Sequence, residues 1–256
     1  ACDGCGFINA NRATLSAGQA IVNGGAIQGY QVQNGQINVT GAGLDSGSAG
    51  YTDLIARAVD VNAGVWAQNL NVAAGEGTVA ADASGVTPSG GGAATGVAID
   101  VSQLGGMYAN SIHLVGTQAG VGVRNAGEIG AAAGQVTITA DGRIENSGTV
   151  NGQQTTLAAN AVANTGVING QTTRIDAVTL DNTGSGRIYG DQISIGATTV
   201  NNIADGGAAP VIAGRERVDI GAQTLNNREH GLIYSGGDMA IGGGLDEQGR
   251  ATGRAD

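Results

Sequence analysis

The sequence predicts an all-β protein built as a parallel β-helix, a solenoid with rungs of about 20 residues. Three observations support this fold class. A short block repeats along the chain, aliphatic and polar residues alternate inside each block, and the chain holds only one Phe and one Trp among 256 residues. A repeat of this length cannot bury its apolar face alone, but repeats stacked in register can, because each rung pairs with the rungs on both sides.

The repeat is clearest over residues 134–184, where a fifteen-residue block occurs three times. Each copy opens with glycine, has an aliphatic residue ten places later and an asparagine two places after that. Two looser copies follow, and in the second the aliphatic residue comes one place late. The opening glycines are Gly134, Gly152, Gly170, Gly190 and Gly214; the aliphatic residues are Ile144, Val162, Leu180, Val200 and Leu225; the asparagines are Asn146, Asn164, Asn182, Asn202 and Asn226. We expect the asparagines to form tight bends, because Asn tolerates the left-handed backbone region, and to hydrogen-bond between rungs.

Alternation inside the blocks separates an inner face from an outer one. Val136, Ile138 and Ala140 point one way, and the polar residues between them point the other. The pairs Ile193/Ile195 and Val218/Ile220 repeat this pattern. Aliphatic side chains therefore belong inside the coil. A leucine-rich repeat has a similar period, but it needs several Leu at fixed offsets and a helical face, which this array lacks.

The chain before the array is less regular. Short aliphatic runs split by glycine predict β segments over residues 1–40, and strict alternation predicts a strand over residues 97–101. Between them, one or two helical turns are expected from Asp53 to Ala58, with Thr52 as the N-cap. Trp66 is interpreted as a core or end-cap residue, with a platform for a ligand as the alternative.

Loop signals divide the chain further. Pro88 and a Ser-Gly-Gly-Gly run predict an exposed loop over residues 76–96. Residues 203–213 are interpreted as an insertion on one rung. We therefore predict three regions, which are an irregular region over residues 1–120, the repeat array over residues 121–242 and a polar tail over residues 243–256 that frays.

The composition argues against several classes of protein. The chain has a net charge of −10 and contains no lysine. Binding to nucleic acid needs a basic face that neutralises phosphates, and binding to an anionic membrane surface needs basic clusters as well. No stretch approaches 18 consecutive apolar residues, so no transmembrane helix is expected. The regularly placed aliphatic residues argue against disorder. The abundant Asn and Gln fit a secreted surface.

The two cysteines, Cys2 and Cys5, form a CxxC motif. A thioredoxin-like redox site would need a βαβ pattern behind it, and none is visible. A zinc site would need two further ligands, and His113 and His230 are far apart in the sequence. A local disulfide between Cys2 and Cys5 that clips a turn of an exported protein is the simplest interpretation, with the redox and metal roles as alternatives.

No constellation of catalytic residues stands out. Some β-helical proteins cleave polysaccharides, and such sites need clustered carboxylates or a base beside Arg or Lys. The carboxylates of the array occupy differing places in the repeat and are interpreted as scattered, solvated charges: Asp141, Glu145, Asp176, Asp181, Asp191 and Asp219. A charged group is formed by Arg215, Glu216, Arg217, Arg228 and Glu229. A solvated face is its simplest interpretation, with a partner surface as the alternative. His113, on an outward strand position, is also interpreted as solvated. We predict no catalytic, cofactor-binding or metal-binding residue.

Three blocks resemble the amino-terminal secretion domain of two-partner secretion exoproteins, the filamentous haemagglutinin family that includes contact-dependent growth inhibition toxins. They are CDGCGFINANRATLSAG from Cys2, GYTDLIARAVDVNAGVWAQNLNV from Gly50, and AIDVSQLGGMYANSIHLVGTQAGVGVRNAGEIG from Ala98. The array after Val121 resembles the start of the family's haemagglutinin repeats, which makes residues 1–120 part of the secretion domain. The family's Asn-Pro-Asn motif should precede the CxxC block. This chain has no Asn-Pro dipeptide, so we expect part of the recognition region to lie upstream.

The resemblance implies a right-handed β-helix that is exported through the periplasm to the cell surface. It implies one partner, an outer-membrane β-barrel transporter with periplasmic domains, and neither nucleic-acid binding nor membrane insertion. The distal filament would adhere to a receptor or glycan on a host or neighbouring cell, or would carry a far carboxy-terminal toxin domain. The segment itself would be non-catalytic. The alternative function is a β-helical carbohydrate-active enzyme, a polysaccharide lyase or hydrolase.

Overall fold

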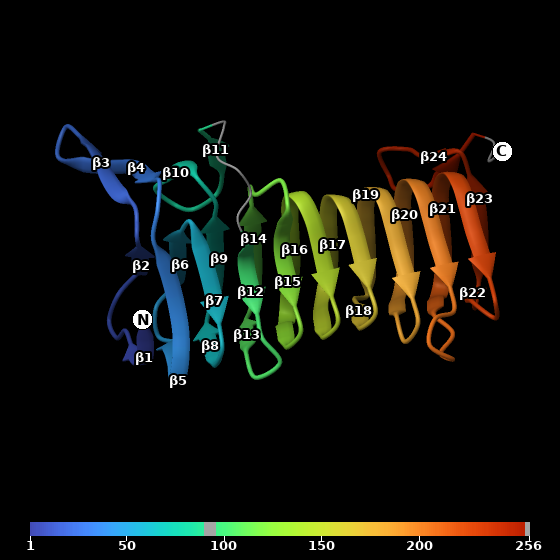
Figure 1. Ribbon diagram of the computed structural model, residues 1–256, viewed down its shortest axis with the longest axis horizontal. Helices are drawn as coiled ribbons and strands as arrows, with labels where there is room; N and C mark the ends of the chain where they lie inside the picture. Colours follow the sequence, from blue (N-terminus) through green and yellow to red (C-terminus); the bar gives the residue numbers. More distant parts are fainter. Residues whose placement is uncertain (90–95, 254–256) are drawn as a thin grey trace.

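The protein is one long coil of β-strands. The computed structural model describes residues 1–89 and 96–253, and these residues include strands but no helix. In Figure 1 the strands nearest the viewer run downward while the chain advances from blue to red, so the coil is right-handed. It makes about 10 turns of roughly 21 residues each, and successive turns pair in parallel. The predicted right-handed parallel β-helix is confirmed.

The first turns, here called the cap (residues 1–120), are built from short strands. Those in the coil are β1 (Cys2–Gly6), β2 (Arg12–Ser16), β5 (Gln36–Ser46), β6 (Tyr51–Ala56), β7 (Ala58–Val61), β8 (Gly64–Ala67), β9 (Asn69–Ala74), β12 (Val97–Val101), β13 (Gly106–Ala109) and β14 (Ser111–Gly116). A separate antiparallel sheet, here called the side sheet, consists of β3 (Gln19–Asn23), β4 (Ala26–Val32), β10 (Gly77–Ala80) and β11 (Val86–Pro88).

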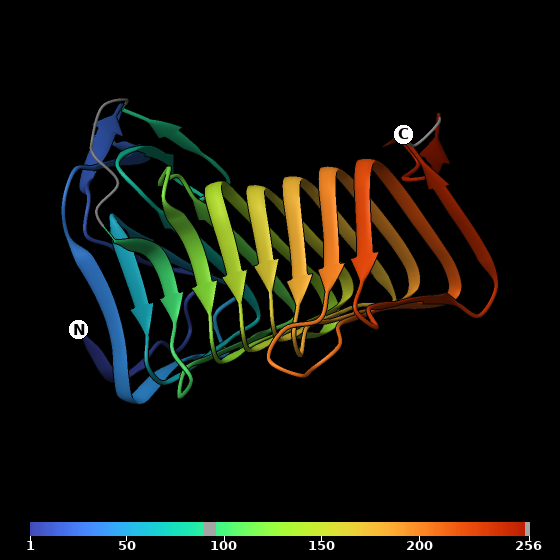
Figure 2. The same cartoon turned by 45° about the vertical axis from the view of Figure 1, so that its right-hand side comes forward.

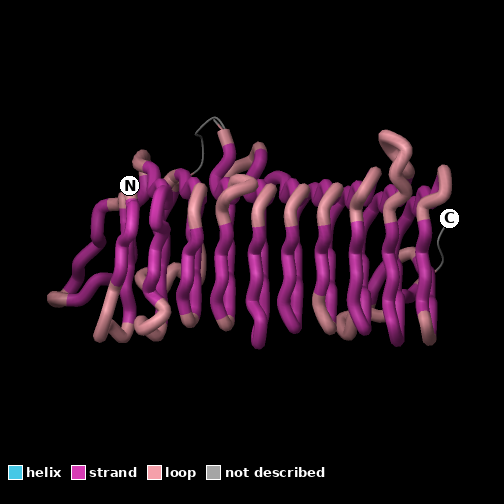
Figure 3. The backbone as a smooth tube through the Cα atoms, turned by 90° about the horizontal axis from the view of Figure 1, so that it is seen from below, coloured by secondary structure: helices cyan, strands magenta, loops and turns pink. Residues whose placement is uncertain are grey.

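The later turns, here called the shaft (residues 121–242), contain longer strands and are more uniform. Figure 3 shows their strands lying side by side along the coil. They are β15 (Val121–Asn125), β16 (Glu128–Asn146), β17 (Thr149–Asn164), β18 (Val167–Asn169), β19 (Thr172–Thr183), β20 (Arg187–Ile203), β21 (Val211–Arg228), β22 (Leu232–Ser235) and β23 (Asp238–Gly242). The predicted insertion on one rung is present as the connection between β20 and β21.

A single aliphatic core runs along the inside of the coil, through both the cap and the shaft. Val136, Ile138 and Ala140 are buried, as the alternation predicts, and the polar residues between them face outward. The aliphatic residues of successive copies stack as one column: Val123, Ile144, Val162, Leu180, Val200 and Leu225 are consecutive partners in the parallel ladders.

The repeated asparagines form a second, polar column at the end of these strands. It consists of Asn125, Asn146, Asn164, Asn182, Asn202 and Asn227. Each side-chain amide donates to the amide oxygen of the next asparagine at 2.8–2.9 Å, and also to a backbone carbonyl of the following rung. The predicted inter-rung hydrogen bonds are confirmed. The predicted left-handed bends are wrong, because among the described residues none of these asparagines has a positive φ.

The fifth copy of the repeat carries one additional residue. Strand β21 has three steps from Gly214 to Arg217 where β20 has two from Gly190 to Gln192, and the extra residue forms a bulge. Everything after the bulge is displaced by one place, which explains the late Leu225. The displacement also corrects our ladder assignment, because Asn227, and not the predicted Asn226, pairs with Asn202.

The side sheet lies outside the coil at its amino-terminal end, as Figures 1 and 2 show. Val32 and Val79 from this sheet pack against Ile55 and Ala73 from the coil, which gives the cap a second small core. The predicted loop over residues 76–96 is therefore wrong for β10 and β11. Strand β10 pairs with β4, a partner that no local pattern reveals. Residues 90–95 of the predicted loop lie outside the described residues.

The predicted helical turn from Asp53 to Ala58 is also wrong. Most of this segment belongs to β6, which pairs in parallel with β2 on one side and β9 on the other. Leu54 faces the main core while Ile55 lies under the side sheet, so both faces of the strand are buried. A strand buried on both faces has a continuous apolar run, and such a run cannot be told from a short buried helix by its period. Thr52 is not an N-cap, and its hydroxyl lies 2.6 Å from that of Ser46.

The predicted frayed tail over residues 243–256 is ordered in its first part. Strands β24 (Gly244–Leu245) and β25 (Ala251–Thr252) form an antiparallel hairpin that turns back toward the coil. Leu245 packs over Gly196, where an added Cβ would lie 3.2 Å from its side chain. Residues 254–256 lie outside the described residues.

Candidate functional site

The two cysteines lie on the first strand of the coil. A disulfide joins Cys2 and Cys5, whose Cα atoms are 5.4 Å apart. The pairing of β1 with β5 is irregular between Asp3 and Cys5, and the carboxylate of Asp3 accepts a hydrogen bond from the Ala42 amide at 3.0 Å. Cys2 is buried in the main core, whereas Cys5 is only partly buried against it. This geometry fits a local clip of the first turn, and the oxidation state in exported protein stays a prediction.

Asp53, in the cap, has a fully buried carboxylate. It accepts hydrogen bonds from Arg12 at 2.7 Å and Thr14 at 2.9 Å, both on β2, and from Asn71 at 2.9 Å on β9. The Arg12 guanidinium lies 4.5 Å from the centre of the Tyr51 ring. Because its carboxylate joins side chains from the neighbouring strands on both sides, Asp53 holds the rungs in register.

The carboxylates of the shaft do not converge on one place. Most have a partner of their own: Glu145 pairs with Arg143, Asp176 with Arg174, Asp181 with Asn201, Asp191 with Arg215, and Asp219 with Arg217. Within residues 1–89 and 96–253, no three His, Cys, Asp or Glu residues are placed to hold a metal ion. These carboxylates are separate from one another, as interpreted, but the interpretation as solvated charges is wrong for Asp219, which is only 2% exposed.

Two further assignments from the sequence concern histidine and the charged group. His113 lies on an outward position of β14, as predicted, but it is half-buried, and burial lowers its pKa below the usual value. The charged group is not one surface. Arg215 and Arg217 lie near the start of β21, whereas Arg228 ends that strand and Glu229 follows it in a turn.

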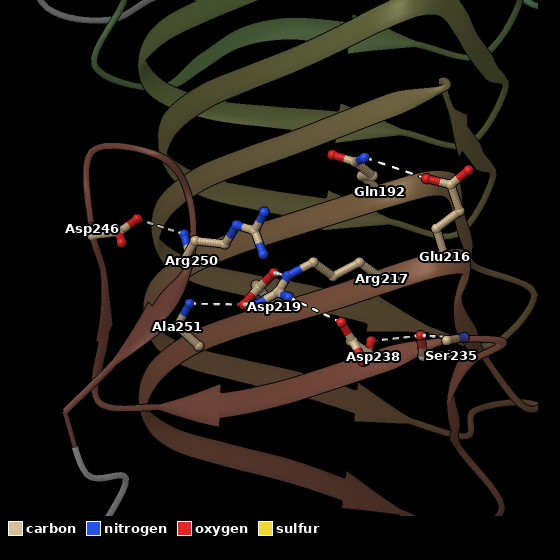
Figure 4. Close-up of polar contacts among 10 residues, drawn as sticks. Gln192, Glu216, Arg217, Asp219, Ser235, Asp238, Asp246, Arg250 and Ala251 are labelled. Carbon is tan, nitrogen blue, oxygen red and sulfur yellow. Dashed lines mark hydrogen bonds and ion pairs between the residues drawn. The ribbon is translucent and has the colours of Figure 1, made fainter.

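A charged cluster ties the terminal hairpin to the shaft, as Figure 4 shows. Arg217 forms a two-pronged ion pair with Asp219, and it also lies 3.4 Å from Asp238. Asp219 in turn accepts a hydrogen bond from the backbone amide of Ala251 at 2.9 Å. Burial opposes ionisation of Asp219, but the hydrogen bonds from Arg217 and Ala251 and the positive charge of Arg217 outweigh it and lower the pKa of Asp219.

Trp66 departs from its predicted place in the core. Its side chain is 44% exposed and stacks on Tyr108 of the next rung, with 6.2 Å between ring centres and 19° between ring planes. The ring lies flat over its own strand, above Gly64. A Cβ at position 64 would lie 2.2 Å from the ring, so glycine is needed to leave room for it. Gly106 makes the same room for Tyr108. Trp66 faces outward because successive side chains of a strand point to opposite faces, and its neighbour Val65 points into the core.

Trp66 and Tyr108 begin an outward column that follows one corner of the coil. The column continues through Gly130, Asn151, Asn169, Tyr189, Ala213 and Tyr234, each paired with the next. From Asn151 onward it borders a groove of about 510 Å³. Sequence reasoning missed this column, because its members are different residue types that only the register of the ladders brings into line.

The glycines that open the repeats line the groove. Gly152, Gly170, Gly190 and Gly214 occupy one corner position on successive rungs. An added Cβ at these positions would lie 2.5–3.1 Å from the backbone two or three residues ahead, so the sharp corner leaves no room for a side chain. Gly134 is the exception, because Ala131 takes this place in the first rung.

In the described part of the chain, no helix is long and apolar enough to cross a membrane.

Comparison with known proteins gives one family and a group of relatives. A family model described as the TPS secretion domain matches residues 1–146. The chain is 54% identical over 155 residues to "Toxin CdiA" of Yersinia pestis, which is 59% of this chain and 5% of that protein. It is 48% identical over 151 residues to "tRNA nuclease CdiA-2" of Burkholderia pseudomallei strain 1026b, and 44% identical over 144 residues to "tRNA nuclease CdiA" of Escherichia coli strain NC101.

These matches cover 58% and 56% of this chain, and 5% and 4% of the relatives. The chain therefore spans about a twentieth of the length of the curated relatives it matches. No solved structure matched the chain significantly. The family match takes in the whole cap and continues into β16, the first long strand of the shaft.

Proposed function

The chain belongs to the TPS secretion domain family of two-partner secretion exoproteins, and on that premise we propose that it has two tasks, to direct export and to begin the extracellular shaft. Exoproteins of this family are secreted and displayed outside the cell. The observation that carries the proposal is the family match over residues 1–146, which covers the whole cap. The division of labour at residue 120 is part of the proposal.

The partner in this proposal is an outer-membrane transporter that recognises the cap. The cap is the part of the chain whose surface is not repeated, since it carries the side sheet and the disulfide of Cys2 and Cys5. A unique surface can be recognised once per chain, whereas a repeated surface offers the same features on every rung. The second task follows from the parallel ladders, because each completed rung is the template on which the next one pairs.

We propose that the segment serves as the stalk of a contact-dependent growth inhibition toxin. The relatives described above carry the names toxin and tRNA nuclease, and this chain matches about a twentieth of their length. We assign no catalysis to the segment, because its shaft carboxylates are held in separate pairs along the surface. Purified protein incubated with polysaccharides should release no new reducing ends. Depolymerisation would favour the carbohydrate-active alternative instead.

Export can be tested in cells that express the full-length exoprotein with its transporter. Deletion of residues 1–120 should abolish surface exposure, measured by protease digestion of intact cells. The matched control is deletion of residues 147–164, which removes one rung and joins Asn146 to Thr165 in the same repeat position. The control should still reach the surface. Equal exposure of both deletions would contradict the proposed role of the cap.

A further inference from the structure

The groove along the corner of the shaft has the chemistry of a binding site for carbohydrate. It is lined by residues of the rungs from β16 to β22, and its volume of about 510 Å³ lies within the range of known ligand sites. Six successive rungs at the usual spacing between strands make it roughly 24 Å long. A groove of this length and openness suits a linear polymer better than a compact small molecule.

Two tyrosines give the groove apolar platforms. Tyr189 and Tyr234 lie in the same outward column, separated by the rung of Ala213. Two rung spacings place the residues about 9–10 Å apart, which is close to the length of a disaccharide unit in an extended β-1,4-linked chain. Aromatic rings pack against the C–H faces of pyranose rings, and the phenol hydroxyl provides a polar tip.

Neutral amides line the other half of the groove. Asn169 donates to the amide oxygen of Asn151 at 2.8 Å, which fixes both side chains. Among the described residues, no protein group hydrogen-bonds the side-chain nitrogen of Asn151, the side chains of Gln153 and Gln171, or the phenol oxygens of Tyr189 and Tyr234. These donors and acceptors are therefore available to the hydroxyl groups of a sugar.

The charges in the groove select against ionic ligands. Asp191 and Arg215 are the charged residues among its described lining, and they form an ion pair with 2.9 Å between Nη1 and Oδ1. The groove is therefore neutral on a chain whose net charge is −10. An extended peptide is also disfavoured, because strand addition needs an unpaired sheet edge. The strands that border the groove are paired on both sides by neighbouring rungs, except β22, which among the described residues pairs with β21 only. A peptide added to the free side of β22 would continue the coil and would not lie along the groove.

We propose that this groove binds an uncharged, extended polysaccharide, with Tyr189 and Tyr234 as stacking platforms and Asn151 as a hydrogen-bonding side chain. The proposal goes beyond export and shaft building, and it does not depend on them. It gives the shaft a way to contact a glycan without cleaving it.

Titration calorimetry of the purified 256-residue chain with uncharged hexasaccharides tests the proposal. The probes are the β-1,4-linked hexamers of glucose, N-acetylglucosamine and mannose, with a heparin hexasaccharide as the charged comparison. We expect at least one neutral hexamer to bind with a dissociation constant below about 1 mM and the heparin fragment not to bind. Tyr189→Ala and Tyr234→Ala should each weaken binding about tenfold.

Tyr51→Ala is the matched control, because Tyr51 is also an exposed tyrosine but lies in the cap, away from the groove. It should leave the affinity unchanged, and Tyr189→Phe should retain the stacking part of it. Circular dichroism melting establishes that each variant is folded. Three results would overturn the proposal: no neutral hexamer binds, only the heparin fragment binds, or the groove variants bind as well as the wild type. None of these results bears on export, which the cell-surface assay measures separately.

Discussion

The cap and the shaft are parts of the same coil, but they are stabilised in different ways. The shaft repeats the same stabilising contacts from rung to rung, with an aliphatic column inside and an asparagine column at the strand ends. The cap is stabilised by features that are not repeated, namely the buried Asp53 with its three donors and the second core beneath the side sheet. Repetition therefore spreads stability over many equal contacts, whereas the cap concentrates it in a few.

The largest expected effect is on the cap. Asp53→Ala removes the charged acceptor that Arg12, Thr14 and Asn71 share. Hydrogen bonds to a charged group contribute about 1.5–3 kcal/mol each, so we expect the loss of the three to cost about 3–5 kcal/mol in total, since Arg12 is partly exposed and regains water. Urea denaturation measures the loss of unfolding free energy. Asp176→Ala removes a partly exposed ion pair of the shaft and should cost no more than about 1 kcal/mol. Equal losses would mean that the cap does not concentrate its stability in this way.

The next effect breaks the repeated column of the shaft. Asn164→Ala removes the side-chain acceptor of Asn146, which keeps its bond to the Val167 carbonyl. It also removes the side-chain donor to the amide oxygen of Asn182 inside the coil, so we expect a loss of about 2–3 kcal/mol in urea denaturation. Asn151→Ala is the control, because Asn151 belongs to an exposed amide pair on the outer face. Its effect should stay within about 0.5 kcal/mol. If Asn164→Ala left the free energy of unfolding unchanged, the asparagine column would not be what holds the rungs together.

The disulfide should contribute less, because it closes a short loop with a sequence separation of 3. Chain-entropy arguments give about 2 kcal/mol for a loop of this size. We expect Cys5→Ser, which leaves the buried Cys2 in place, to lower the stability of the cap by up to that amount and to leave the shaft unaffected. Mass spectrometry of exported protein after alkylation without reductant should find Cys2 and Cys5 unmodified. Alkylated cysteines would refute the clip.

The smallest effect is local and depends on pH. The lowered pKa of Asp219 means that its contact with the Ala251 amide stabilises the hairpin above the usual carboxyl pKa of 3.8 and is lost as pH falls through the lower folded value. Hydrogen exchange should show that protection of the Ala251 amide persists at pH 3.8 and is reduced as the pH falls further, after correction for the intrinsic rate. Asp219→Asn cannot titrate, so its protection should not vary with pH in this range.

Particular residues show where local patterns stop being informative. The alternation of Val136 and Ile138 predicted their burial correctly, because the pattern and the structure share the same period. The strand at Leu54 and Ile55 was predicted as helix, because its two buried faces belong to different cores. Asn226 was placed in the ladder in error because a bulge after Gly214 shifts the count by one residue.

The sequence by itself determined the coil, its inner and outer faces and its asparagine column, because these repeat at a fixed period and each copy reinforces the others. Only the tertiary structure decided what covers the cap, since β10 finds its partner β4 far away in the sequence. Tertiary structure also decided the groove. Its column of Asn151, Tyr189 and Tyr234 has no common residue type, and these side chains share a surface only because the parallel ladders bring their rungs into register.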